Sequence, residues 1–114
     1  NESFLDSLGW VLYKRGKFTE ARKYLEQAVG PAAFPDPVVL DHLADTLYRL
    51  SQNADATKLW QRSLKGIGEG EPDRDDLKQL RIQLIQKIKD AEANKPVEVA
   101  PTVEGTTSTA QAKQ

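Results

Sequence analysis

The chain has 114 residues, of which 39% are hydrophobic and 29% are charged, an ordinary composition for one small globular domain. Sixteen basic against seventeen acidic residues leave a net charge of −1, so the charge favours neither nucleic acid nor an anionic membrane as a partner. The absence of cysteine excludes a disulfide framework, a thiolate metal site and a cysteine nucleophile. The chain begins at Asn1 and contains no methionine, and we expect it to be part of a longer protein.

Four helices are predicted in the first half of the chain, because apolar residues recur there at spacings of three and four. Gly16 and Gly30 end the first two helices, since glycine adopts the left-handed conformation at low cost. Asp36 and Pro37 begin the third, because a carboxylate caps unpaired N–H groups and proline suits the first helical turn. The predicted helices span about residues 2–15, 18–29, 37–50 and 54–65.

A fifth helix is predicted over about residues 74–93, after a linker rich in glycine and proline at 66–72, with Asp73 as its cap. One stripe of this helix is apolar and should be buried, and it consists of Leu77, Leu80, Leu84, Ile88 and Ala91, widened by Ile85. The other faces are polar and should be exposed, and they carry Lys78, Arg81, Gln83, Lys87 and Lys89. Residues 95–114 have no sustained period and are predicted to be a disordered tail.

The first two predicted hairpins are related by an internal repeat with an offset of 35 residues. The first motif is Leu5-x2-Leu8-Gly9-x2-Leu12 followed by Ala21-x3-Leu25 and Ala28, and the second is Leu40-x2-Leu43-Ala44-x2-Leu47 followed by Ala56-x3-Trp60. This pattern resembles the signature of tetratricopeptide repeats. Small residues stand where the helices must approach closely, and larger apolar residues fill the space between them.

The resemblance implies an all-α fold, a right-handed helical-repeat solenoid made of two antiparallel helix hairpins plus a C-terminal capping helix. Within the repeat region, residues 1–65, the two repeats span about residues 2–30 and 37–65, and the capping helix spans 73–94. In this family ligands usually lie along the concave surface formed by the first helix of each repeat. The matching positions here are Asp6, Trp10, Tyr13, Lys14, Asp41, His42, Asp45, Tyr48 and Arg49.

The resemblance therefore implies a protein-interaction module, and these residue types suggest a peptide or helix with apolar anchors and some basic character. Relatives that bind the acidic tail of heat-shock chaperones use a lysine and two asparagines at positions corresponding to Asp6, Trp10 and His42. A carboxylate in place of the lysine would repel that tail, which argues against this ligand.

Other roles remain open for these residues. The aromatic side chains can serve packing, and the carboxylates can form a solvated polar face. His42 with Asp41 and Asp45 gives at most a partial metal site, so we expect neither a metal nor another cofactor. Because no serine is placed beside His42, we expect no catalytic activity. The alternative function is structural, with the chain forming the C-terminal end of a longer solenoid or a surface for homo-oligomer formation.

Overall fold

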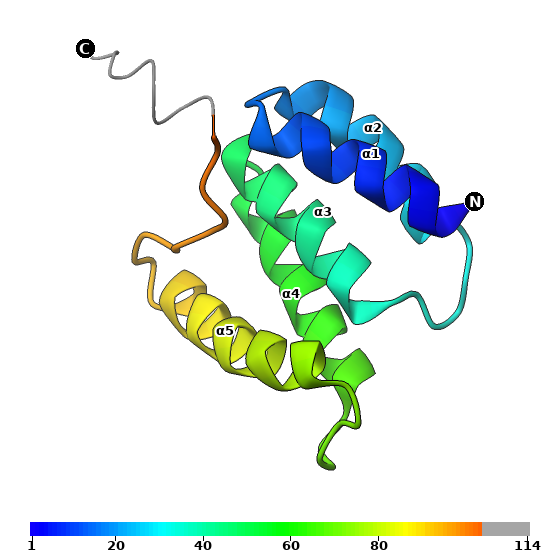
Figure 1. Ribbon diagram of the computed structural model, residues 1–114. Helices are drawn as coiled ribbons and strands as arrows, with labels where there is room; N and C mark the ends of the chain where they lie inside the picture. The colour runs from blue at the N-terminus through cyan, green and yellow to red at the C-terminus, as the bar shows by residue number, and fades with distance from the viewer. Residues whose placement is uncertain (104–114) are drawn as a thin grey trace.

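Figure 1 shows the protein as a computed structural model that describes residues 1–103, in which two helical hairpins are followed by a fifth helix and an extended segment. Over these residues the chain forms helices and irregular segments and no strand. None of the described helices is long and apolar enough to cross a membrane. The helices are α1 (Glu2–Lys14), α2 (Phe18–Val29), α3 (Pro37–Arg49), α4 (Asn53–Ile67) and α5 (Asp75–Glu92).

Local sequence signals explain most of the helix ends. The Asp36 side chain accepts a hydrogen bond from the Val38 N–H at 2.8 Å, and Pro37 occupies the first turn of α3. Gly16 turns the first hairpin with a positive φ of 78°, and Ser51 takes the same left-handed conformation, with φ of 65°, at the equivalent place in the second.

The start of α5 differs from the prediction of an Asp73 cap. The cap position belongs to Arg74, whose side chain makes no capping hydrogen bond. Its guanidinium instead bridges Asp76 at 2.8 Å and Asp36 at 3.1 Å, so an exposed ion-pair cluster links the start of α5 to the start of α3.

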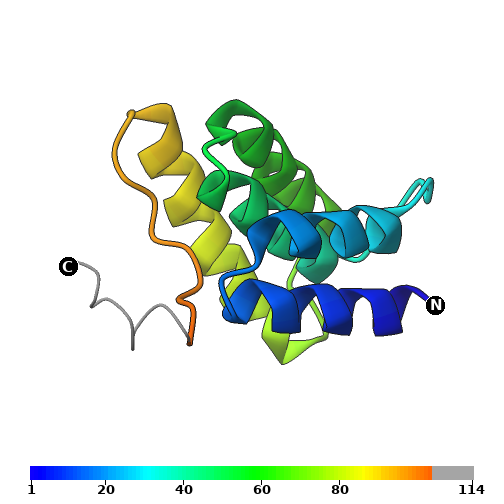
Figure 2. The ribbon, with the colours of Figure 1, turned by 90° about the horizontal axis from the view of Figure 1, so that it is seen from above.

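The two hairpins form two layers, with α1 and α3 in front in Figure 1 and α2 and α4 behind them. Figure 2, seen from above, shows α5 running obliquely from back to front beside the second hairpin. Within the first hairpin, α1 and α2 approach closely at Gly9, where a Cβ atom would lie 2.7 Å from Leu25 Cγ. Trp60 of α4 is fully buried, and α5 packs on α4 through Leu80 and Leu84. The predicted fold class, two antiparallel helix hairpins closed by a capping helix, is confirmed.

Two residues of α5 lie on the opposite side from the one predicted. Ile85, expected to widen the buried stripe, is 52% exposed. Lys87, expected on a solvent face, is buried. Lys87 lies three residues after Leu84 and seven after Leu80, so helical geometry places it on the inner side despite its charge.

The end of the described chain also differs from the prediction of a disordered tail. After α5 the chain turns at Asn94, which has φ of 57°, and then runs in an extended path across the front layer toward the C-terminal end of α1 (orange in Figures 1 and 2). We call residues 95–103 the C-terminal segment. Its Val97 is only 7% exposed and belongs to the core, so this part of the predicted tail is ordered. The rest of the predicted tail, 104–114, lies outside the described residues.

Candidate functional site

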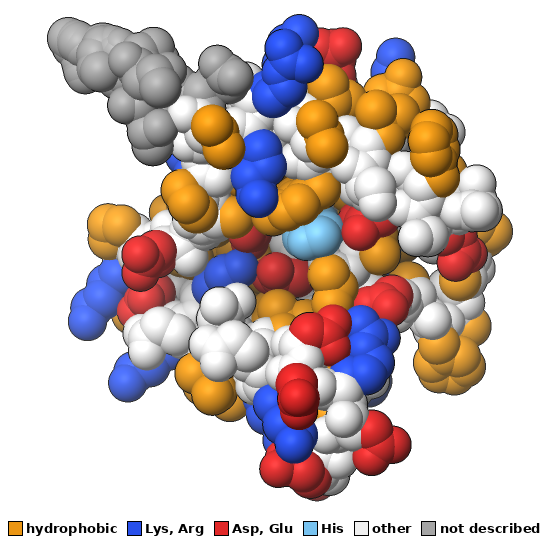
Figure 3. Space-filling model, in the orientation of Figure 1, with side chains coloured by type: hydrophobic (Ala, Val, Ile, Leu, Met, Phe, Trp, Pro, Cys, Tyr) orange, Lys and Arg blue, Asp and Glu red, His pale blue; other side chains and the backbone are white. Residues whose placement is uncertain are grey.

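A groove of about 890 Å³ lies on the front face between α1 and α3 on one side and α5 on the other. It is visible as the hollow near the centre of Figure 3, where basic, acidic and apolar side chains meet. The C-terminal segment forms one wall of it. Representative lining residues are Trp10, His42 and Asp45 from the repeats, Gln83 and Lys87 from α5, and Ala100 from the segment.

The repeats hold the C-terminal segment through its main chain. The Val97 N–H donates to the Tyr48 hydroxyl at 2.9 Å, and the Ala100 N–H donates to Asp45 Oδ2 at 3.2 Å. The Ala100 carbonyl accepts from the Tyr13 hydroxyl at 2.6 Å and from Arg49 Nη2 at 2.7 Å.

A further contact extends this pattern to the end of α1, where the Val103 N–H donates to the Lys14 carbonyl at 2.7 Å. Each of these five hydrogen bonds involves a peptide group of the segment. Peptide groups are common to every sequence, so this arrangement can hold an extended chain with little regard to its side chains.

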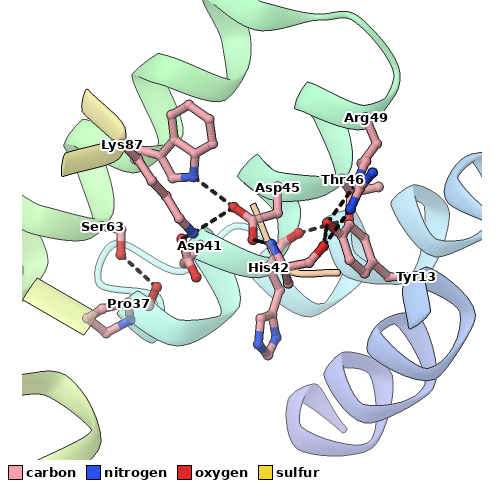
Figure 4. A network of polar contacts seen from close by, with 11 residues as sticks. Tyr13, Pro37, Asp41, His42, Asp45, Thr46, Arg49, Ser63 and Lys87 are labelled. Atoms are coloured by element: carbon pink, nitrogen blue, oxygen red, sulfur yellow. Dashed lines mark hydrogen bonds and ion pairs between the residues drawn. The ribbon is translucent and has the colours of Figure 1, made fainter. Parts of the chain in front are cut away.

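A buried charge network supports the groove from below (Figure 4). Lys87 Nζ lies 2.9 Å from both Asp41 Oδ1 and Asp45 Oδ1. Asp45 Oδ1 also accepts a hydrogen bond from Trp60 Nε1 at 3.0 Å. Asp45, only 1% exposed, thus joins α3, α4, α5 and the C-terminal segment, because its other oxygen faces Ala100.

The pKa values in this network reflect the conflict between burial and charge pairing. Burial, followed by repulsion from Asp45, raises the pKa of Asp41 to about 6, although Lys87 opposes the change. Burial lowers the pKa of Lys87, but the two carboxylates outweigh it and leave that pKa above its ordinary value. Burial raises the pKa of Tyr13, with the hydrogen bond from Arg49 acting in the opposite direction.

The wall of the groove on α1 and α3 carries a second cluster. His42 Nδ1 lies 2.8 Å from Asp6 Oδ1, and the His42 ring stacks on Trp10 with centroids 3.7 Å apart. Trp10 in turn stacks on Tyr13 at 4.4 Å, and Lys14 Nζ lies 5.6 Å from the centre of the Trp10 ring. In residues 1–103 there is no group of three or more metal-ligating side chains.

Comparison with known proteins identifies the repeat type. Residues 3–29 match the family model described as tetratricopeptide repeat. Over 43 residues the chain is 42% identical to a TPR repeat-containing protein of Pseudomonas aeruginosa, a match that covers 38% of this chain and 7% of that protein. The chain is of the tetratricopeptide-repeat type. It matches only a small part of the length of that curated relative, and no solved structure matches it.

Tetratricopeptide repeats generally mediate contacts between proteins. All nine residues predicted from the family pattern lie on α1 or α3. Four of them direct polar groups at the C-terminal segment, namely Tyr13, Asp45, Tyr48 and Arg49. Asp41 and Asp45, predicted to face basic groups of a partner, are instead ion-paired with Lys87.

Two parts of the site are absent from the sequence-based prediction. Lys87 was detectable, because its spacing from Leu80 and Leu84 is that of the buried stripe. The C-terminal segment gave a weaker signal, the alternation of Val97 with Val99 after a proline, which is too short to predict an ordered element.

Proposed function

We propose that the chain is a protein-interaction module that binds an extended peptide in the groove between α1, α3 and α5. The observation that supports this is the main-chain recognition of the C-terminal segment by Tyr13, Asp45, Tyr48 and Arg49. A peptide that follows the same path would meet the same donors and acceptors. The hydrogen bonds would hold its main chain, and the walls of the groove would select its side chains.

The walls favour a peptide with apolar and basic residues, for reasons different from those first expected. Lys87 pairs with both Asp41 and Asp45 and offsets one of their two negative charges, so these carboxylates attract a partner less than two free carboxylates would. Asp90, which lines the groove from α5 and accepts a hydrogen bond from the uncharged Gln86, is better placed to attract lysine or arginine. The part of Trp10 that lines the groove, beside the His42 and Tyr13 rings stacked on it, offers an apolar contact for a side chain, as aromatic residues commonly do at interfaces.

Selection from a random library of nine-residue peptides tests this function. The selected peptides are titrated against the Val97→Asp chain, in which a carboxylate at a buried position of the C-terminal segment should release it from the groove. They are also titrated against the same chain carrying the double change Tyr48→Phe, Arg49→Met, which lacks two of the groups that contact the main chain. We expect peptides rich in basic and branched apolar residues that bind the double variant about thirtyfold more weakly, since two hydrogen bonds at roughly 1 kcal/mol each are lost. Peptides that bind both proteins equally would place the binding surface elsewhere.

A structural role is the second candidate function, and the position of α5 supports it. Leu80 and Leu84 cover α4, and the C-terminal segment already takes the hydrogen bonds that the groove offers. In that case the chain completes the end of a longer repeat stack or mediates self-association. Failure of the library to yield any groove-binding peptide would favour this second candidate.

A further inference from the structure

We infer that the C-terminal segment is an intramolecular competitor for the groove, so that a partner peptide binds only when residues 95–103 leave it. This inference rests on the proposed function and adds a means of regulating the same site. It follows from three observations. The atoms that hold the segment are those a peptide would need, the segment has few contacts, and the buried polar groups of the groove keep other partners after the segment leaves.

The same atoms cannot serve the segment and a partner together. Asp45 Oδ2 accepts from Ala100, the Tyr48 hydroxyl accepts from Val97, and the Tyr13 hydroxyl donates its only proton to the Ala100 carbonyl. A second chain on the path of the segment would also collide with Val99 and Ala100, which line the groove.

The contacts of the segment are few enough for it to be displaced. Val97 is its one buried side chain, and burial of one valine contributes roughly 1.5–3 kcal/mol. Neither of its charged side chains, Lys95 and Glu98, forms an ion pair within the described part of the chain. The segment is joined to α5 by a short turn at Asn94, and it has no helical hydrogen bonds of its own beyond that turn.

Release of the segment leaves the groove intact, because its buried polar groups have second partners. Asp45 keeps Lys87 and the Trp60 N–H, and Tyr13 keeps the hydrogen bond from Arg49 Nε at 3.1 Å. No buried charge loses its compensating partner when the segment departs. The repeats are therefore built to exist with the groove open as well as closed.

The expected size of the effect follows from tethering. A short linker gives a tethered ligand an effective concentration on the order of 1 mM. If the groove binds the segment with a dissociation constant of about 0.1 mM, the segment would occupy the groove in about nine molecules out of ten. The apparent affinity of any competing peptide then falls about tenfold.

The probe for this inference is a fluorescein-labelled peptide with the sequence of residues 95–103, titrated into the full chain by fluorescence anisotropy. The test variant is Val97→Asp, which puts a carboxylate at the one buried position of the segment and should release it. Val97→Thr is a milder variant that keeps the shape of the side chain. Val11→Asp is the matched control, because it makes the same change at an exposed valine on α1.

We expect Val97→Asp to bind the probe about tenfold more tightly than the parent, Val97→Thr to lie between them, and Val11→Asp to match the parent. Equal, measurable binding by all four proteins would overturn the inference and leave the proposed function standing. No binding by any of them would show that the groove has no affinity for an extended peptide, and both proposals would fall. A dimer of the parent that dissociates in Val97→Asp would show exchange of the segment between two copies and would overturn the intramolecular competition.

Discussion

Replacing Lys87 with methionine removes the positive charge from the buried network while keeping most of the volume of the side chain. Asp41 and Asp45 then share a buried site with no cation, although each lies 2.9 Å from Lys87 Nζ in the parent. Loss of one partner from a buried ion pair typically destabilises a protein by roughly 3–5 kcal/mol. A domain of this length is stable by only about 5–15 kcal/mol, so the loss would be a large part of the total.

Proton uptake places the expected effect near the lower end of that range. The pKa of Asp41 is already about 6, so at pH 7 its protonation costs only about 1.4 kcal/mol, and this limits what Asp41 adds to the loss. Asp45 keeps the hydrogen bonds from Trp60 and Ala100, which offset part of its own cost. We therefore expect Lys87→Met to lose about 3 kcal/mol of unfolding free energy at pH 7.

Urea denaturation followed by circular dichroism measures this loss, with Lys89→Met as the matched control on the exposed side of α5. The control should stay within about 0.5 kcal/mol of the parent. Adding Asp41→Asn to Lys87→Met should recover about 1 kcal/mol at pH 7, because it removes one of the two uncompensated carboxylates. Equal stability of the Lys87 and Lys89 variants would refute the assignment of Lys87 to a buried structural charge.

Three further predictions concern stability in urea denaturation. Gly9→Ala should lower the free energy of unfolding by roughly 1–3 kcal/mol, because the added methyl group would lie 2.7 Å from Leu25 Cγ. Its control is Gly66→Ala at an exposed helical site, which should be neutral or up to about 1 kcal/mol more stable. Ser51→Gly should gain about 1 kcal/mol, since glycine adopts the φ of 65° without strain; a loss would contradict this. Burial raises the pKa of Asp41 to about 6 in the folded chain, above its ordinary value of 3.8, so Asp41 takes up its proton more readily in the folded state. Lowering the pH from 7 to 5 should therefore stabilise the parent by about 1 kcal/mol relative to Asp41→Asn, and a constant difference between the two proteins would contradict this.

The helices were predictable because their signals are local. Apolar spacing, the Asp36–Pro37 start of α3 and the turn after α1 each depend on a few neighbouring residues, and the structure agrees with each of them. The need for a small residue at Gly9 was also predictable, since it follows from the close packing of the two helices in a repeat.

The composition of the groove was harder to predict, because it depends on contacts between distant residues. The order of the C-terminal segment comes from hydrogen bonds between Ala100 and side chains 51 to 87 residues earlier in the chain, and no local pattern encodes them. A charged residue on a helix is usually exposed, so Lys87 was assigned to solvent although its position is that of the buried stripe. Its role becomes apparent only when Asp41 and Asp45 are seen opposite it.

Hydrogen exchange of the Val97 and Ala100 amides, measured by NMR in the full chain with and without a library-selected peptide, tests the central claim most directly. These two N–H groups are bonded to Tyr48 and Asp45, so they should be protected in the chain alone. Binding of the peptide in the groove should remove their protection, while the amides inside α3 remain protected. Protection that persists at both amides under saturating peptide would contradict the account, because the peptide would then bind without taking the place of the C-terminal segment.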